Sequence, residues 1–555
     1  MPASRPQSTD LPAERAVPAR ATAWAVLAWV VAWVMLRLSL SEALKWDYGE
    51  QMLWSQQLAW GYGPQPPLYT WLQWGANELL GPSVLALALL KGVLMILTPV
   101  FWLLAARIVM PAAWAPFAAL GTLLLPVSVW IGVRDVTHTL LVSCSVAAFW
   151  WALLRQLQRP TAGGFVALGV AVAAALLSKY NAVLVIAAAL LAAASLPAPR
   201  RALRAPGWLW TPLVAAALLA PHAAWVGSNW GRATAETLEK MQRGTASDSW
   251  LVGVLTGLGS LLPLLVATLL PWALALTWAF GAGVWRRGFG AAAAHRPLPP
   301  SWLGPLLARY VMMVLAGLLA MVLLGTTRFD GRWLHPLLAC VPVLGFGWLV
   351  RETPGARARR RWWGLLTALA VLMLVLPAVD AWRDARRGTP ERFNWPLALM
   401  ARELRDAGYD GRSLIVADHL TLGGSLRIPF PHAPVVACDA AKERSVACVA
   451  HHVQAARHAG QAWLLVAAED EAPPAWWSAA APLDETGPPL QQRALPYRGA
   501  GAGAAPMRFV FRWQPPPRDG QAKDWYQQAL KPIDCEDASS TSSAPAPPSS
   551  GLACT

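Results

Sequence analysis

Long runs of apolar residues, separated by short polar breaks, fill roughly the first two thirds of the chain. A run of about 20 apolar residues is long enough to cross a bilayer as a helix, so the pattern predicts about eleven membrane-spanning helices. The predicted spans are 22–40, 84–106, 112–131, 136–154, 162–178, 182–197, 208–226, 257–282, 305–327, 333–350 and 362–379. The expected fold class is therefore an α-helical polytopic membrane protein, with a transmembrane domain over residues 22–379.

After the last apolar run the pattern changes to short segments typical of a soluble α/β fold. Strands are predicted at 413–418, 435–436, 463–467 and 507–513. A helix near 440–458 lies between two of them, and Asn394 is placed to cap another helix that runs through Leu404. These elements predict a small α/β domain over residues 380–514. The Pro-, Ser- and Ala-rich remainder, 515–555, predicts a disordered tail.

Composition and charge support a membrane protein. Hydrophobic residues make up 56% of the 555 residues and charged residues 14%, and soluble domains are about one quarter charged. This excludes a disordered chain and an ordinary soluble enzyme. The net charge of +15 comes from basic residues spread between the apolar runs, which favours cytoplasmic loops and anionic lipid as their partners rather than nucleic acid. The basic bias places residues 1–21 in the cytoplasm, and an odd number of spans then places residues 380–514 on the outer side.

The chain has six cysteines, which are too few for a disulfide scaffold. Cys438 and Cys448 lie in the predicted outer domain. If that domain faces an oxidising compartment, the two can form a bridge, and the sequence leaves open whether they do.

The segment 41–83, between the first two spans, is the longest break in the apolar pattern and is rich in Trp and Tyr. Such residues suit the headgroup level of a membrane, and we expect 51–60 to form an amphipathic helix lying in the interface. Asp47 and Glu50 precede this helix. Their spacing fits a capping box with Asp47 as N-cap, which local spacing favours, or a catalytic carboxylate at the membrane face.

The second half of this loop holds five candidates for contact with a substrate, namely Tyr62, Gln65, Pro66, Pro67 and Tyr69. The prolines predict an extended stretch over 64–69, because a residue before proline avoids the helical region. A rigid connector into the second span is the simpler interpretation.

Four basic residues stand at breaks that the predicted orientation places on the outer side. They are Arg134, Lys179, Arg328 and Arg332. Each can be an interfacial or snorkelling side chain, or a ligand for phosphate. Arg134 is followed by Asp135, and such a pair at a helix mouth is often structural; its alternative is a functional carboxylate.

Five segments together carry a resemblance to a known family. They are WDYGE at 46–50, WSQQLAWGYGPQPPLYTWLQ at 54–73, RDVTHTLL at 134–141, LSKYNAVLVI at 177–186 and RWLHPLL at 332–338. Their order and content resemble the bacterial integral-membrane glycosyltransferases of family 39 in the GT-C class, which are relatives of protein O-mannosyltransferases and of the lipid A aminoarabinose transferase.

The resemblance implies a transferase that moves a sugar from a polyprenyl-phosphate donor to a hydroxyl at the outer face of the bacterial inner membrane. Asp47 matches the family's catalytic base, and Asp135 matches a second acidic position. Many relatives carry two adjacent acids at the first position, whereas here the next acid is Glu50. The common His-Pro-Pro is replaced by Gln65-Pro66-Pro67.

A single displacement would invert the anomeric carbon, with Lys179, Arg332 and either Arg328 or Arg134 stabilising the phosphate. A divalent metal cation bridging Asp47 and Asp135 is compatible with the sequence but is not required by it.

The sequence does not decide whether the acceptor is a lipid, a glycan or a protein. A lipid-linked saccharide flippase or transporter is a second hypothesis, and a structural subunit of an envelope complex is a third. Neither alternative needs a base in a long outer loop or an appended outer domain.

Overall fold

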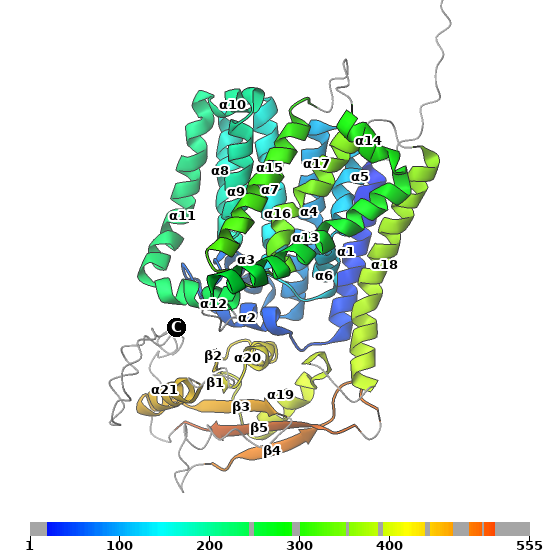
Figure 1. The fold of residues 1–555 in the computed structure, drawn as a ribbon. Helices are drawn as coiled ribbons and strands as arrows, with labels where there is room; N and C mark the ends of the chain where they lie inside the picture. The colour runs from blue at the N-terminus through cyan, green and yellow to red at the C-terminus, as the bar shows by residue number, and fades with distance from the viewer. Residues whose placement is uncertain are drawn as a thin grey trace, which may run out of the picture.

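The structure is a computed structural model, and it describes residues 19–242, 249–290, 300–350, 355–386, 392–438, 445–469, 488–501 and 504–516. Most of the predicted N-terminal segment and nearly all of the predicted tail lie outside these ranges. A tall helical bundle stands on a small α/β layer at one end (Figure 1).

The bundle is built from apolar helices joined by short breaks. In the first half they are α1 (Ala19–Leu40), α2 (Trp46–Trp54), α3 (Leu68–Leu80), α4 (Val84–Val109), α5 (Ala115–Leu120), η1 (Gly121–Leu124), α6 (Pro126–Val133), α7 (His138–Gln158), α8 (Ala162–Ser178) and α9 (Ala182–Ala194). In the second half they are α10 (Pro197–Leu203), η2 (Pro206–Leu209), α11 (Trp210–Ser228), α12 (Trp230–Gln242), α13 (Trp250–Phe280), α14 (Gly283–Gly290), α15 (Leu303–Leu323), α16 (Gly331–Leu338), α17 (Cys340–Leu349) and α18 (Ala356–Arg386).

Seven helices of the described chain are long and apolar enough to cross a membrane, and the number rises to nine if each of two bent helix pairs counts as one span. The multi-span prediction is confirmed, but its count of eleven is not reached. The predicted span 333–350 is divided at Ala339 into α16 and α17, each too short to cross a bilayer alone. The predicted span 162–178 is α8, which has 17 residues.

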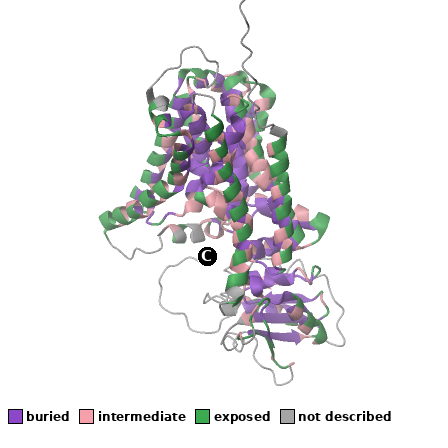
Figure 2. Cartoon of the chain, turned by 90° about the vertical axis from the view of Figure 1, so that its right-hand side faces the viewer, coloured by how far each residue is buried: buried purple, intermediate pink, exposed green. Residues whose placement is uncertain are grey.

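Burial separates central helices from peripheral ones. In the most apolar stretch of α7, 83% of residues are buried, against 17% in α11, α13 and α18. Figure 2 shows this as a buried centre surrounded by helices with exposed outer faces. Large apolar side chains such as Leu255, Val266 and Trp278 are more than half exposed, and this is the surface expected of helices that face lipid.

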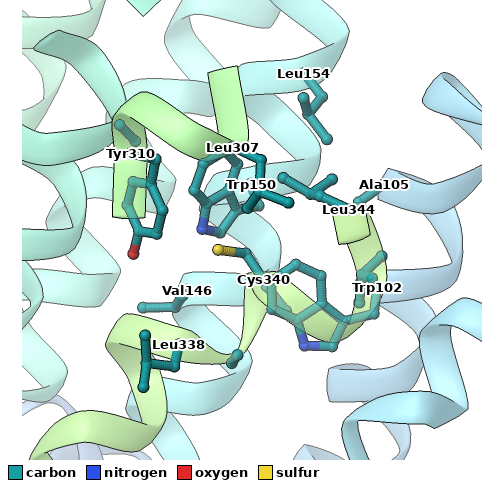
Figure 3. Close-up of a cluster of buried hydrophobic side chains, with 14 of the residues drawn as sticks. Trp102, Ala105, Val146, Trp150, Leu154, Leu307, Tyr310, Leu338, Cys340 and Leu344 are labelled. Carbon is teal, nitrogen blue, oxygen red and sulfur yellow. The ribbon is translucent and has the colours of Figure 1, made fainter. Parts of the chain in front are cut away.

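The centre of the bundle is packed by aromatic side chains from distant helices (Figure 3). Trp150 of α7 meets Tyr310 of α15 edge to face, with ring centroids 5.0 Å apart. The Tyr310 hydroxyl donates to the Leu337 carbonyl at 2.6 Å, which satisfies a buried polar group at the end of α16. This contact fixes α16, and with it the loop that precedes it, against the centre of the bundle.

The α/β layer contains one sheet of five strands in the order β2-β1-β3-β5-β4. The strands are β1 (Leu414–Ala417), β2 (Val435–Ala437), β3 (Trp463–Glu469), β4 (Gln491–Leu495) and β5 (Met507–Gln514), and the helices are η3 (Arg392–Asn394), α19 (Leu397–Asp406), α20 (Leu420–Leu426) and α21 (Ser445–His458). β1, β2 and β3 are parallel, with Ile415 paired to Val435, and β5 runs antiparallel between β3 and β4. α19 and α20 pack on one face of the sheet and α21 on the other.

The four predicted strands are confirmed, and the sequence missed β4. The missed strand reads QQRAL and is largely exposed, so it has no apolar alternation to mark it. The predicted cap at Asn394 is wrong, because Pro396 precedes α19, and the Asn394 amide instead donates to the carbonyls of Ala381 and Arg498. Cys438 and Cys448 form a disulfide.

The α/β layer is joined closely to α2 of the bundle. The Leu44 amide donates to the Ser425 hydroxyl at 3.0 Å, and the Gln56 side chain exchanges two hydrogen bonds with the Val435 backbone on β2. The Arg427 guanidinium is buried and donates to the Met52 carbonyl. α20 therefore lies directly against α2, and the outer layer takes part in holding that helix in place.

Gly424 of α20 is the point of closest approach to α2. A Cβ at this position would lie 2.4 Å from the Gly49 carbonyl oxygen, which is backbone and cannot rotate away. We expect Gly424→Ala to destabilise the junction by about 1–3 kcal/mol, the usual effect of overpacking. Thermal unfolding and limited proteolysis of the outer layer would measure it. Gly75→Ala in α3 is the control, because nothing lies within 4 Å of its added Cβ. Equal unfolding of the two variants would contradict the expectation.

Candidate active site

Four chain segments meet at the end of the bundle that faces the α/β layer (Figure 1). They are α2, the loop 134–137 before α7, the break between α8 and α9, and the segment 328–332, which leads into the first turn of α16. The candidate carboxylates and cations predicted from the sequence all lie on these segments.

The helix of the first loop begins earlier than the sequence predicted. It spans Trp46–Trp54 rather than 51–60, with Lys45 at the N-cap position and no side chain capping it. Asp47 therefore lies inside the first turn, and the capping-box interpretation of Asp47 and Glu50 is wrong. Just before the helix, the Leu44 amide donates to the Ser425 hydroxyl of α20, a contact that local spacing does not reveal.

The Asp47 carboxylate is partly buried against the bundle. The backbone amide of Thr137 donates to it, and the cations Arg332 and Lys179 lie within electrostatic range. Burial raises the pKa of the Asp47 carboxyl, and it outweighs the opposing effect of these cations and of the Thr137 amide. The group is thus a carboxylate with a raised proton affinity that faces two cations.

Asp135 lies in a different environment, because its charge is matched by a cation that the sequence analysis missed. The Arg37 guanidinium of α1 is 3.1 Å from the Asp135 carboxylate, and both side chains are 3% exposed. Arg37 also donates to the carbonyls of Ser41 and Ala43. Asp135 is therefore the buried counter-ion of Arg37, and it lies on the loop that presents the Thr137 amide to Asp47.

A second missed cation supports the same loop. Lys91 of α4 is fully buried, donates to the Arg134 carbonyl at 2.6 Å and lies over the Trp33 ring. Arg37 and Lys91 both interrupt apolar runs, and a basic residue inside a membrane helix is the signal that would have pointed to them.

Buried amides and hydroxyls hold α2 against α3 and α7. The Gln51 amide lies 3.1 Å from the His138 ring nitrogen Nε2, and its carbonyl oxygen accepts from the Thr70 hydroxyl at 2.8 Å. All three side chains are buried. Glu50, the neighbour of Gln51, is half-buried on the same helix.

A cavity of about 530 Å³ opens beside these segments. Its lining includes polar and charged side chains, namely Gln65, Lys179, Tyr180, Asn181, Arg328, Asp330 and Arg332. It also includes apolar side chains of α9, α15 and α16, namely Val183, Leu184, Leu318, Met321 and Leu337. The cavity is thus amphipathic, and two of its three cations, Lys179 and Arg332, are within electrostatic range of Asp47.

Arg332 is oriented by an acidic neighbour. Its guanidinium donates to the Asp330 carboxylate at 2.7 and 3.0 Å and lies over the Trp130 ring. Burial alone would raise the pKa of the Asp330 carboxyl, but the hydrogen bonds and charge of Arg332 hold it below its usual value. The ion pair therefore keeps a cation in place at the rim of the cavity.

The other predicted cations are distributed differently. Arg328 is exposed and lines the cavity. Arg134 is exposed, and its side chain is not among the residues that line the cavity. Its carbonyl accepts from Lys91.

The predicted substrate loop is only partly extended. Gln65 lines the cavity, and Pro66 and Pro67 are buried. Tyr69 lies inside α3, which begins at Leu68, so the prediction of an extended stretch through Tyr69 is wrong: Pro67 adopts helical angles and starts the helix, as proline does readily. The Tyr62 hydroxyl donates to the Gln57 carbonyl and accepts from the Ala59 amide, which closes the loop on itself.

A metal shared by Asp47 and Asp135 does not fit these donors, because the two Asp135 oxygens already accept from Arg37 at 3.1 and 3.2 Å. In the described residues the one cluster with metal-ligand spacing is Cys438, Cys448 and His452, and its two cysteines are joined in the disulfide.

A second cavity of about 340 Å³ lies within the bundle between α1, α4, α7 and α18. Apolar side chains dominate its lining, and His335 is its one titratable ring. No carboxylate or cation lines this cavity, whereas the amphipathic cavity is lined by Asp330 and three cations.

Known proteins resemble this chain in sequence and in fold. Residues 64–225 match a family described as dolichyl-phosphate-mannose-protein mannosyltransferase. The chain is 32% identical over 423 residues to the lipopolysaccharide core galacturonosyltransferase RgtB of Rhizobium johnstonii, covering 74% of this chain and 82% of that protein. It is 33% identical over 437 residues to RgtA of the same organism, described as the same kind of enzyme, covering 77% and 84%.

Among solved structures, ArnT from Cupriavidus metallidurans bound to undecaprenyl phosphate aligns with a TM-score of 0.54 at 16% identity. The alignment covers 88% of this chain and 98% of that one. The two proteins therefore share a fold.

Proposed function

The chain is a GT-C glycosyltransferase of the family that includes the two rhizobial galacturonosyltransferases, and we propose that Asp47 is the general base of its transfer reaction. The donor is a sugar linked to a polyprenyl phosphate, and the acceptor is a hydroxyl. The observation that carries the proposal is the position of Asp47, held by the Thr137 amide and within range of two cations that line an amphipathic cavity.

The cavity suits the two chemically different parts of a lipid-linked donor. Lys179, Arg332 and Arg328 would contact the phosphate, and the apolar side chains of α9 and α15 would contact the start of the polyprenyl chain. Asp330 keeps Arg332 oriented and is not itself a phosphate ligand.

The reaction needs one proton acceptor. The acceptor hydroxyl attacks the anomeric carbon, the bond from that carbon to the phosphate oxygen breaks, and the hydroxyl proton passes to Asp47. Phosphate is a good leaving group when cations stabilise its charge, so a general acid of the kind used by glycoside hydrolases is not needed. A single displacement of this kind inverts the anomeric carbon.

The two carboxylates have separate roles in this proposal. Asp47 touches the reacting atoms, whereas Asp135 acts through the loop that carries Thr137.

The active end of the bundle lies at the outer face of a bacterial inner membrane in this proposal, with residues 1–21 in the cytoplasm and residues 380–514 in the periplasm. The two rhizobial relatives are described as lipopolysaccharide core galacturonosyltransferases. The proposal therefore includes galacturonic acid as the transferred sugar and lipopolysaccharide core as the acceptor.

Transfer of radiolabelled sugar from a panel of polyprenyl-phosphate sugars, with purified protein in lipid and membrane extract as acceptor, tests the proposal. We expect acceptor-stimulated release of polyprenyl phosphate and inverted product. Movement of intact labelled donor across sealed vesicles without transfer would instead support a flippase or transporter.

Arg332→Gln should weaken donor binding. Removing one charge-assisted contact to phosphate lowers affinity by about tenfold, so the KM for donor should rise by about that factor. Initial rates against donor concentration measure the change. Arg134→Gln removes the same charge from a nearby exposed side chain outside the cavity and should leave the KM unchanged. Equal effects of the two substitutions would place the phosphate elsewhere.

A further inference from the structure

The cavity of about 340 Å³ between α1, α4, α7 and α18 has no part in the reaction described above. Three of its lining residues are exposed, namely Ala21 and Ala25 on α1 and Thr367 on α18. His335, which lines it from α16, is 3% exposed. In their most apolar stretches α1 and α18 bury only 22% and 17% of their residues. The cavity therefore opens between two lipid-facing helices and extends into the bundle.

The lining of this cavity is apolar except for a few groups that lack a partner. Among the described residues, the Thr22 hydroxyl oxygen, Nδ1 of His335 and Nε1 of Trp363 are buried atoms without a hydrogen bond, and all three side chains line the cavity. Buried polar atoms of folded proteins nearly always have a partner, and an indole N–H can only donate. A ligand that satisfies this lining has an apolar body and an oxygen that accepts a hydrogen bond.

The two helices that flank the opening are fixed to each other. The Trp29 indole of α1 donates to the Ala370 carbonyl of α18 at 2.8 Å, and both residues line the cavity. A second cavity of about 470 Å³, lined only by apolar residues and Trp382, lies further along the same two helices toward the α/β layer. A long apolar chain that enters between α1 and α18 therefore has space along both helices.

Basic side chains stand at the end of α18 that lies away from the α/β layer (Figure 1). The first turns of the helix read ARARRR at 356–361, with no acidic residue among them. Arg360 is exposed and forms no ion pair with any residue in the described ranges. It precedes Trp363 by three residues, so the two lie on the same side of the helix. Clustered basic residues next to a membrane helix attract anionic lipid headgroups.

We propose that this cavity binds one anionic glycerophospholipid from the leaflet opposite the α/β layer. Such a lipid combines the three features that the site offers to match. Its acyl chain fills the apolar part, its ester carbonyls accept from the Trp363 indole and the Thr22 hydroxyl, and its phosphate lies near Arg360. The inference does not depend on the proposed reaction, because none of these residues belongs to the catalytic site.

Native mass spectrometry of the full chain tests the charge of the ligand. The protein is released from detergent micelles that contain equal amounts of phosphatidylglycerol and phosphatidylcholine, and we expect one phosphatidylglycerol to be retained in preference. Arg360→Gln should weaken its binding about fivefold, the usual effect of one basic residue near an anionic lipid surface. Arg201→Gln is the control, because Arg201 is exposed on α10 at the same end of the bundle and does not line the cavity.

Ala25→Leu tests whether the lipid enters the cavity. Ala25 is an exposed lining residue, so leucine narrows the opening without overpacking the core, and retention of phosphatidylglycerol should be lost. Ala23→Leu adds the same side chain to an exposed position of α1 that does not line the cavity, and it should retain the lipid. Thermal unfolding of both variants without added lipid verifies that they are equally folded.

Three results would overturn the assignment. Equal retention of phosphatidylcholine and phosphatidylglycerol would show that the site does not select an anionic headgroup. Equal retention of phosphatidylglycerol by Ala25→Leu and Ala23→Leu would place the lipid on the outer surface of the helices. Preferred retention of polyprenyl phosphate from a mixture with phosphatidylglycerol, lost in Ala25→Leu, would assign the cavity to the polyprenyl chain instead.

Discussion

Asp47→Asn should lower kcat by about two to four orders of magnitude, which is the usual contribution of a positioned general base. Asn keeps the size of the side chain and an oxygen that can accept from the Thr137 amide, so the local fold should persist. It cannot take the proton of the acceptor hydroxyl. Donor binding should remain, because Lys179, Arg328 and Arg332 are unchanged.

Single-turnover transfer of labelled sugar, together with equilibrium binding of the polyprenyl-phosphate donor, measures the two effects separately. Glu42→Gln is the matched control, since it removes an exposed carboxylate from the same loop. A kcat for Asp47→Asn equal to that of Glu42→Gln would show that Asp47 is not the general base, and Glu50 would be the next candidate.

The pH profile gives an independent check on the same group. An exposed aspartate has a pKa of about 3.9. Burial raises the pKa of the Asp47 carboxyl, so this group takes up its proton at a higher pH. Activity that needs the ionised base must therefore fall as the pH drops through this raised value. We expect the acidic limb of kcat/KM to lie above about pH 4. A limb at or below the ordinary aspartate value would mean that another group, or none, controls it.

The sequence predicted those features that local patterning determines. Apolar runs marked the membrane helices, and short apolar segments marked four of the five strands, whereas the largely exposed β4 has no such segment. The sequence also indicated Asp47, Lys179 and Arg332 as candidate site residues. The fold places both cations within electrostatic range of Asp47. Predictions made from neighbouring residues alone were wrong where a contact with a residue distant in the sequence determines the structure.

Two contacts show this limit. The chain just before α2 is bonded to Ser425, which is 381 residues from its partner Leu44, and capping rules applied to 46–50 take no account of such a contact. The role of Asp135 depends on Arg37, which is 98 residues away on another helix. A charged residue inside an apolar run indicates that it has a partner, but only the packing of the helices shows which residue that partner is.

Arg37→Gln should be the most destabilising of the substitutions considered. It leaves the Asp135 carboxylate buried without its cation, and breaking a buried ion pair in this way costs about 3–5 kcal/mol. The loop 134–137 should shift, the Thr137 amide should lose its contact with Asp47, and activity should fall with stability. Denaturant unfolding in mixed micelles and the transfer assay measure the two effects.

The double variant Arg37→Leu with Asp135→Leu distinguishes a structural pair from a catalytic one. Replacing both members of a buried pair by apolar side chains of similar size is often nearly neutral, because no charge is left uncompensated. We expect its stability to return most of the way to that of the unsubstituted protein, with a large positive coupling between the two positions. If the double variant is folded and regains transfer, Asp135 acts by position. If it is folded but as inactive as Asp47→Asn, the Asp135 carboxylate takes part in the chemistry itself.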